Sequence, residues 1–114
     1  MGESSLTLLK GTLDVLILRT LSWEPLHGYA ISRWIREQSG EVFRVEEGAL
    51  YPALRRLEER GLIAGEWSLT DTGREAKFYV LTREGRASMR RELRDWTRYV
   101  EAMTRVLQAR RTTS

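Results

Sequence analysis

One apolar stripe near the end of the chain limits the possible folds more than any other feature of the sequence. Between Glu84 and Arg110 the large apolar residues follow one another at steps of 4, 3, 4, 3 and 4 positions. These residues are Met89, Leu93, Trp96, Val100, Met103 and Leu107. The spacing is that of a helix that packs along a single heptad seam. We therefore expect one long helix over 84–110 and a partner for its stripe, because such a stripe left in water favours aggregation.

Three shorter helices are predicted ahead of this long one. Apolar residues recur at helical spacing over 6–22, 29–40 and 46–60. Gly40 and Gly61 follow the second and third of these segments, where glycine commonly ends a helix.

A β-hairpin is predicted between the third helix and the last. The strand-forming segments "LIAGEWSL" and "AKFYVLT" enclose the turn-rich "TDTGRE", and Thr82 then suits the N-cap of the long helix. Three helices followed by a hairpin form the pattern of a winged helix-turn-helix. We expect an α+β, mostly helical fold, with a DNA-binding domain over 1–82 and a dimerisation helix over 83–114 in one compact unit.

The third predicted helix has an unusual surface. Its narrow apolar stripe consists of Leu50, Leu54 and Leu57. The rest of the helix carries Tyr51, Pro52, Arg55 and Arg56. Proline is tolerated only near a helix start and on a face outside the core, since it cannot donate a backbone hydrogen bond. In a winged helix-turn-helix this helix enters the major groove, so Tyr51, Arg55 and Arg56 are candidate DNA contacts.

The charge balance is compatible with a nucleic-acid partner. The chain has 19 basic and 16 acidic residues, and 17 of the basic residues are arginine. The planar fork of arginine suits phosphates and base edges. A genome rich in G and C, whose codons favour arginine, explains the composition equally well.

Several other function classes are not supported. The 114 residues contain no cysteine, no apolar run long enough to cross a bilayer, no signal peptide, and neither of the common nucleotide-binding glycine motifs. His27 is the one histidine and has no partners at metal-ligand or catalytic spacing. We expect a cytoplasmic protein that is not an enzyme, with no metal, cofactor or membrane contact.

Four motifs together resemble the PadR family of bacterial transcriptional regulators. They are "LLKGTLDVLILRTL", "HGYAI", "GALYPALRRLEERGLI" and "GREAKFYVLTREG", in the order and spacing of that family. The single long helix after the hairpin resembles its short branch. The resemblance implies a homodimeric repressor that binds pseudo-palindromic operators, with release on binding small aromatic or hydrophobic compounds in some members.

The resemblance also implies positions for the DNA contacts. Tyr29, Gly48, Ala49, Tyr51 and Arg55 match places at or near the DNA contacts of the family. Its basic wing corresponds to Arg74 and Lys77. Asp71 and Glu75 dilute the wing charge, which departs from the family pattern and weakens the expectation of phosphate contact there.

The seam of the long helix is the predicted dimer interface, packed against 6–22 with Leu9 and Leu13. Trp96 lies midway along it, and a ring facing its own copy leaves a flat gap for a planar aromatic ligand. Leu93 and Val100 would line that gap. Simple packing of Trp96 in the seam is the alternative.

Two function classes remain. The first is a dimeric DNA-binding repressor, and the second is a winged-helix dimerisation or adaptor module that binds a protein. The bare face of 46–60, with two arginines and no apolar patch, favours DNA.

Overall fold

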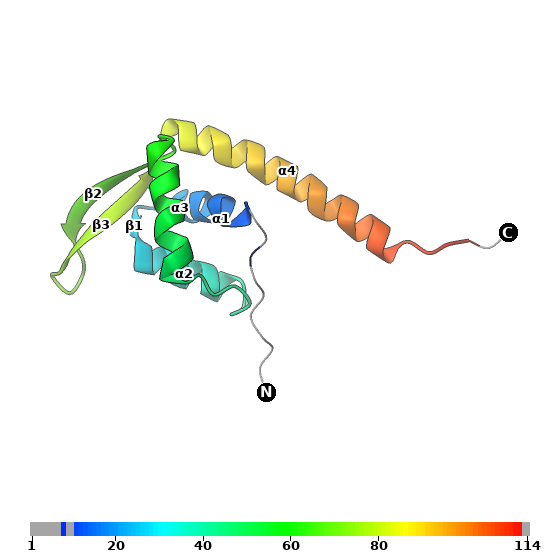
Figure 1. The fold of residues 1–114 in the computed structure, drawn as a ribbon, viewed down its shortest axis with the longest axis horizontal. Coiled ribbons are helices and arrows are strands. Elements are labelled where there is room, and N and C mark those ends of the chain that lie inside the picture. The colour runs from blue at the N-terminus through cyan, green and yellow to red at the C-terminus, as the bar shows by residue number, and fades with distance from the viewer. Residues whose placement is uncertain (1–7, 9–10, 113–114) are drawn as a thin grey trace.

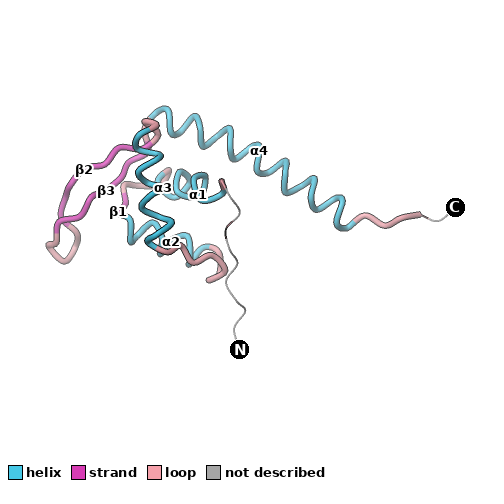
Figure 2. The backbone as a smooth tube through the Cα atoms, viewed as in Figure 1, coloured by secondary structure: helices cyan, strands magenta, loops and turns pink. Residues whose placement is uncertain are grey.

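The computed structural model describes residue 8 and residues 11–112. The described chain forms four helices and a three-stranded antiparallel sheet (Figures 1 and 2). The elements are α1 (Thr12–Leu21), β1 (Leu26–His27), α2 (Gly28–Gln38), α3 (Glu47–Glu59), β2 (Ile63–Leu69), β3 (Glu75–Leu81) and α4 (Arg83–Gln108). The expected order of three helices, a hairpin and a long helix is confirmed, and the fold is a winged helix.

Two details differ from the sequence-based expectation. The first helix begins at Thr12 rather than at residue 6, because Gly11 has a left-handed backbone with φ of 87° and interrupts a right-handed helix. Leu6 and Leu9, which were included in that helix, lie outside the described residues. The short strand β1 was not expected. Its two residues pair with Tyr79 and Phe78 of β3, on the side of β3 opposite to β2.

The hydrophobic core forms around α1, where the other helices and the sheet pack against it. Ile17 and Leu18 of α1 are fully buried, as are Ile31 of α2 and the apolar stripe of α3. The sheet adds Ile63 and Tyr79 to the same cluster. Burial of this kind supplies the main driving force of folding, so each helix presents its apolar side to the core and its polar side to solvent.

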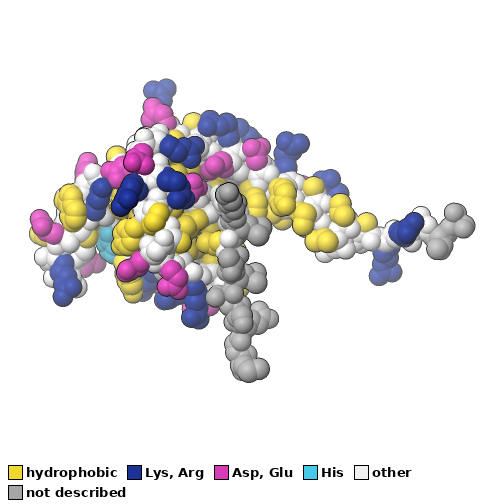
Figure 3. All heavy atoms as spheres, in the orientation of Figure 1, with side chains coloured by type: hydrophobic (Ala, Val, Ile, Leu, Met, Phe, Trp, Pro, Cys, Tyr) yellow, Lys and Arg dark blue, Asp and Glu magenta, His cyan; other side chains and the backbone are white. Residues whose placement is uncertain are grey.

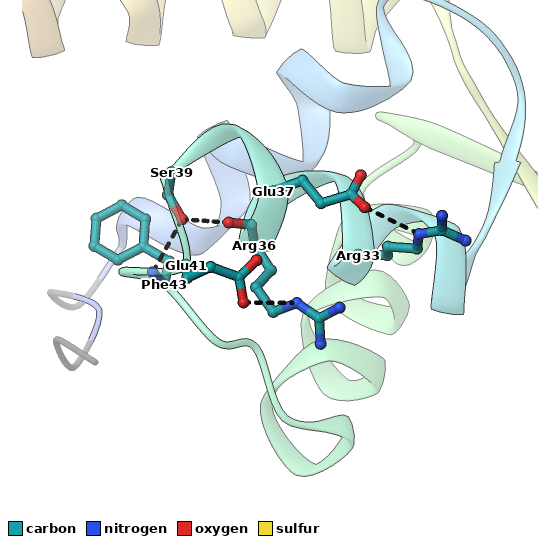
Figure 4. A network of polar contacts seen from close by, with 6 residues as sticks. All are labelled: Arg33, Arg36, Glu37, Ser39, Glu41 and Phe43. Atoms are coloured by element: carbon teal, nitrogen blue, oxygen red, sulfur yellow. Dashed lines mark hydrogen bonds and ion pairs between the residues drawn. The ribbon is translucent and has the colours of Figure 1, made fainter. Parts of the chain in front are cut away.

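The turn between α2 and α3 is held by a small polar network (Figure 4). The Ser39 hydroxyl donates to the Arg36 carbonyl at 3.0 Å and accepts from the Phe43 amide at 3.0 Å. Arg36 also pairs with Glu41, whose own backbone has a positive φ of 68°. The network holds the loop that connects α2 to the start of α3.

A second junction attaches α4 to the winged domain. The Thr82 hydroxyl donates to the Gly61 carbonyl at 2.6 Å and accepts from the Gly85 amide at 3.0 Å, so the predicted N-cap is confirmed. The Thr82 amide donates to the Leu62 carbonyl at 3.1 Å. A Cβ on Gly85 would overlap that same carbonyl oxygen. Only glycine therefore lets the first turn of α4 approach the start of β2 this closely.

Replacing Gly85 by alanine should destabilise the fold by roughly 1–3 kcal/mol or more, because backbone must move to accept the methyl group. Gly48→Ala is the matched control, since Gly48 also lies in the first turn of a helix and a Cβ there meets no atom within 4 Å. That control should be neutral or stabilising by up to about 1 kcal/mol. Chemical denaturation measures both. Equal stability of the two variants would show that the contact at Gly85 is not a constraint.

Candidate nucleic-acid interface

The exposed face of α3 matches the sequence-based description. The apolar stripe is buried, whereas Gly48, Ala49 and Pro52 are exposed and Tyr51 is partly so. Two small residues at the start of the helix allow close approach of another surface. No side chain caps α3 at Glu46, which leaves amides of its first turn for an external acceptor. The carboxylates of Glu46 and Glu47 at the same end oppose phosphate binding there.

The two candidate arginines of α3 have different surroundings. Arg56 reaches across to α1, where its Nη2 lies 3.2 Å from the Asp14 carboxylate. Arg55 is exposed and makes no ion pair with any described residue. Arg55 is therefore available to an external anion or base edge, whereas Arg56 first has to leave Asp14.

Tyr51 is placed by a glycine of the neighbouring helix. A Cβ on Gly28 would lie 2.9 Å from the Tyr51 hydroxyl oxygen and 3.0 Å from its Cε1. The ring thus packs directly on the first turn of α2. His27 caps this helix, since its Nδ1 accepts from the Ala30 amide at 3.2 Å. The "HGY" motif therefore positions Tyr51, and its own Tyr29 is exposed.

Lys77 is held by α3 and is not displayed at the tip of the wing. Its Nζ lies 2.9 Å from Glu58 Oε1, and this hydrogen bond is the main reason that the pKa of Lys77 is raised. The Lys77 chain runs across Gly65, where a Cβ would overlap its Cε. Arg74 lies at the tip and pairs with no described carboxylate.

An open concavity of about 1150 Å³ lies between the start of α2 and the hairpin. It brings together Tyr29, Tyr51, Arg74 and Lys77 from the predicted DNA contacts. The predicted contacts on the rest of α3 do not line it; they are Gly48, Ala49, Arg55 and Arg56. The lining includes Trp67 and Leu69 of β2, which the sequence analysis did not single out.

The seam of α4 changes character along the helix. Met89 is 5% exposed and belongs to the core of its own chain, and Leu13 of α1 packs against the same core. The later seam residues Leu93, Trp96, Val100, Met103 and Leu107 are between 37% and 74% exposed. Figure 3 shows hydrophobic side chains in a row along this part of α4. Trp96 stacks on Tyr99 of its own chain, with ring centroids 5.4 Å apart and planes at 9°.

Comparison with known proteins agrees with this geometry. A profile of the Transcriptional regulator PadR-like family matches residues 17–91. The chain belongs to the PadR-like family. Members of the family are transcriptional regulators, a non-enzymatic class, and they bind DNA. The resemblance inferred from the four motifs is thereby confirmed.

Similar proteins come from several bacteria. The negative transcriptional regulator PadR of Bacillus subtilis is 32% identical over 80 residues, which are 70% of this chain and 42% of that protein. A PadR-like transcriptional regulator of Bacillus cereus has a solved structure that superposes with a TM-score of 0.79 at 28% identity, covering 90% of this chain and 97% of that one. A PadR family regulator of Clostridium difficile gives 0.75 at 31% identity, covering 85% and 99%. The chain thus spans less than half of the Bacillus subtilis protein.

Two kinds of feature are absent from the described part of this PadR-like chain. Along residue 8 and residues 11–112, no helix is long and apolar enough to cross a bilayer. In the same part of the chain, no three His, Asp or Glu side chains gather at a distance that would hold a metal ion.

A partly buried carboxylate lies where α4 crosses α1. Glu92 Oε2 is enclosed and finds no hydrogen-bond donor among the described residues. Burial raises the pKa of Glu92 above its ordinary value of 4.5, and the charge of Asp14 raises it further. Arg60 and Arg91 act in the opposite direction. Ionised Glu92 is therefore an unfavourable element of the folded state.

This carboxylate should make stability depend on pH. A raised folded-state pKa means that the folded protein binds more protons, so stability falls as pH rises from about 4.5 through the raised value. Glu92→Gln should therefore melt at a higher temperature than wild type at pH 7, with the difference vanishing near pH 4. Glu66→Gln, the same change at an exposed position of β2, is the control and should change little. A Glu92→Gln variant less stable than wild type at pH 7 would contradict this assignment.

Proposed function

We propose that the chain is a homodimeric transcriptional regulator that binds a two-fold symmetric DNA site with one α3 in each half-site. Its action is repression in the cytoplasm, and a small planar compound relieves it. Repression is supported by the relative in Bacillus subtilis, which is named a negative regulator. The expected domain boundary, 1–82 and 83–114, is part of the same proposal.

The uncovered seam of α4 carries the dimer proposal. Five large side chains from Leu93 to Leu107 lie exposed on one helix face at heptad spacing. No other element of the described chain covers them, because α4 extends past α1 and away from the domain (Figure 1). A second α4 offers the same apolar spacing in return, as a two-fold interface requires.

The exposed face of α3 supports the proposal that the chain binds DNA. It combines small residues, a tyrosine and an arginine without an internal ion pair, and it exposes no large aliphatic side chain. Such a surface fits a groove lined with phosphates and base edges better than the apolar centre of a protein interface. A protein-binding adaptor remains the second candidate, and it predicts no selective duplex binding.

The seam can be tested with two neighbouring substitutions. Met103→Glu places a charge in the seam and should convert the dimer to monomers at micromolar concentration. Ala102→Glu adds the same charge one residue away, on an exposed position outside the seam, and should leave the dimer intact. Light scattering coupled to gel filtration gives the mass. A wild-type mass equal to one chain of 13.3 kDa would refute the dimer.

The α3 face can be tested with its two neighbouring arginines, using a duplex that the wild-type protein selects from a random library. Arg55→Ala should lose roughly 1–3 kcal/mol of binding free energy per half-site if this side chain reads a base. Arg56→Ala should lose much less affinity, since Arg56 is engaged by Asp14. Fluorescence anisotropy measures both. Undiminished affinity of a folded Arg55→Ala dimer would exclude Arg55 as a DNA contact.

The proposed effector site lies at the middle of the α4 seam, between Leu93 and Val100. Trp96 and Tyr99 already form a parallel two-ring stack within one chain. Tyr99 thus covers one face of the Trp96 ring. In the proposed site the other face of the ring is directed toward the two-fold axis. A planar aromatic compound stacks well on such a surface. Because α4 also sets the separation of the two α3 helices, ligand and DNA would be coupled, with equal effects in both directions.

Calorimetric titration with planar aromatic dyes tests this site. Trp96→Ala should weaken dye binding at least about tenfold, because stacking and apolar contact are both lost. Val106→Ala, on an exposed residue beside the seam, is the control and should bind as wild type does. Dye affinity indifferent to Trp96 would leave this residue with a packing role alone.

A further inference from the structure

The first half of α4 carries a set of arginines on one face of the helix. They follow one another at steps of 3, 4 and 4 residues, and all of them are exposed. We call them the arginine row: Arg83, Arg86, Arg90 and Arg94. The buried residues Gly85, Ser88 and Met89 lie on the opposite side of the helix, against the domain. Figure 3 shows Lys and Arg side chains along the edge of α4 that lies across the helix from its hydrophobic side chains.

No carboxylate of the described chain neutralises the arginine row. None of its members forms an ion pair with a described residue. Within 83–94 the acidic residues are Glu84, in the first turn, and Glu92, whose Oε2 is enclosed on the other side of the helix. The next arginine at this spacing, Arg98, shares a surface hollow with Asp95 and Glu101, so the row ends before it. Because like charges four residues apart destabilise a helix, an anion bound along the row would relieve their repulsion.

The arginine row begins at the end of α3 that is remote from the first predicted DNA contacts. Thr82, which caps α4, donates to the Gly61 carbonyl just after α3 ends. Gly48 and Ala49 lie in the first turn of α3, and the 13 residues of this helix span roughly 20 Å. From the junction at Gly61, α4 runs away from the domain (Figure 1). The row is therefore a separate surface from the start of α3.

The spacing and chemistry of the arginine row fit a chain of phosphates. Arg83 and Arg94 are roughly 16 Å apart along the helix axis, so the row cannot converge on one small anion. Guanidinium groups bind phosphate oxygens through paired hydrogen bonds. The other residue of 83–94 on this face is Ala87, whereas protein interfaces depend on large buried anchors. A nucleic-acid backbone therefore suits the row better than a protein does.

We propose that the arginine row binds the phosphates of a second DNA segment, so that one dimer bridges the duplex bound by α3 and another duplex. This inference rests on the proposed function for the first duplex. Phosphate contacts carry no sequence information, so the second segment needs no defined site. The row lies outside the proposed seam from Leu93 to Leu107, and each subunit of the dimer would present one.

A capture assay with the full chain tests the bridge. A duplex that wild type selects from a random library is fixed to beads and saturated with protein, and a labelled duplex without the selected sequence is added at low salt. Wild type should retain the labelled duplex. Arg90→Ala/Arg94→Ala should retain about fivefold less or lower still, because two phosphate contacts are lost, and should bind the selected duplex within about twofold of wild type. Arg105→Ala/Arg110→Ala removes the same charge at the far end of α4 and should capture as wild type does.

The outcomes separate this inference from the proposed function of α3. No capture by wild type, or equal capture by Arg90→Ala/Arg94→Ala, would overturn the arginine row as a DNA site while the role of α3 stands. Affinity for the selected duplex that falls in step with capture would place the row on the first duplex and overturn the bridge. A wild type that selects no sequence would overturn the role of α3. Low-salt binding of an unselected duplex that Arg90→Ala/Arg94→Ala weakens would then still support the row.

Discussion

The close approach of α4 to the start of β2 determines how this molecule presents its two exposed surfaces. Gly85 lies against the Leu62 carbonyl with no room for a side chain, and Thr82 bonds to both Gly61 and Leu62. Since Gly61 also ends α3, one short junction sets the end of α3, the start of the sheet and the direction of α4. The angle between α3 and the seam of α4 is thus set by packing at this junction, and a flexible linker has no part in it.

Support from α1 and α2 gives the α3 surface its shape. The buried stripe of α3 rests on α1, Asp14 holds Arg56, and the glycine of "HGY" allows Tyr51 to lie on the start of α2. What remains exposed on α3 is a narrow, polar surface with Arg55 near its centre. In the proposed dimer, a change in the angle between the two α4 helices would move both copies of this surface as rigid bodies, and this is the proposed route by which an effector at the seam would alter DNA binding.

Periodicity and turn chemistry predicted most of the fold, because α2, α3, the hairpin and α4 each have a local pattern that tertiary packing reinforces. β1 was missed since two residues carry no period, and the start of α1 was misplaced because the backbone of Gly11 cannot be read from apolar spacing. Contacts between residues far apart in the sequence were equally impossible to predict. Nothing in the local sequence shows that Glu58 binds Lys77, that Asp14 binds Arg56 or that Met89 belongs to the core. Tyr51, Arg55 and Arg56 were predicted from the exposed face of the third helix and the other candidate contacts from a resemblance, whereas the exposure of Trp67 and Leu69 on β2 could not be predicted from the sequence.

The central claim is that α4 joins two chains so that both α3 helices meet one duplex at a set separation. Inserting about half a helical turn, roughly five base pairs, between the selected half-sites rotates one of them to the opposite side of the DNA. Affinity measured by fluorescence anisotropy should then fall to that of a duplex with one half-site. Unchanged affinity for the lengthened site would contradict the account, because it would mean that the two recognition surfaces are not held together by α4.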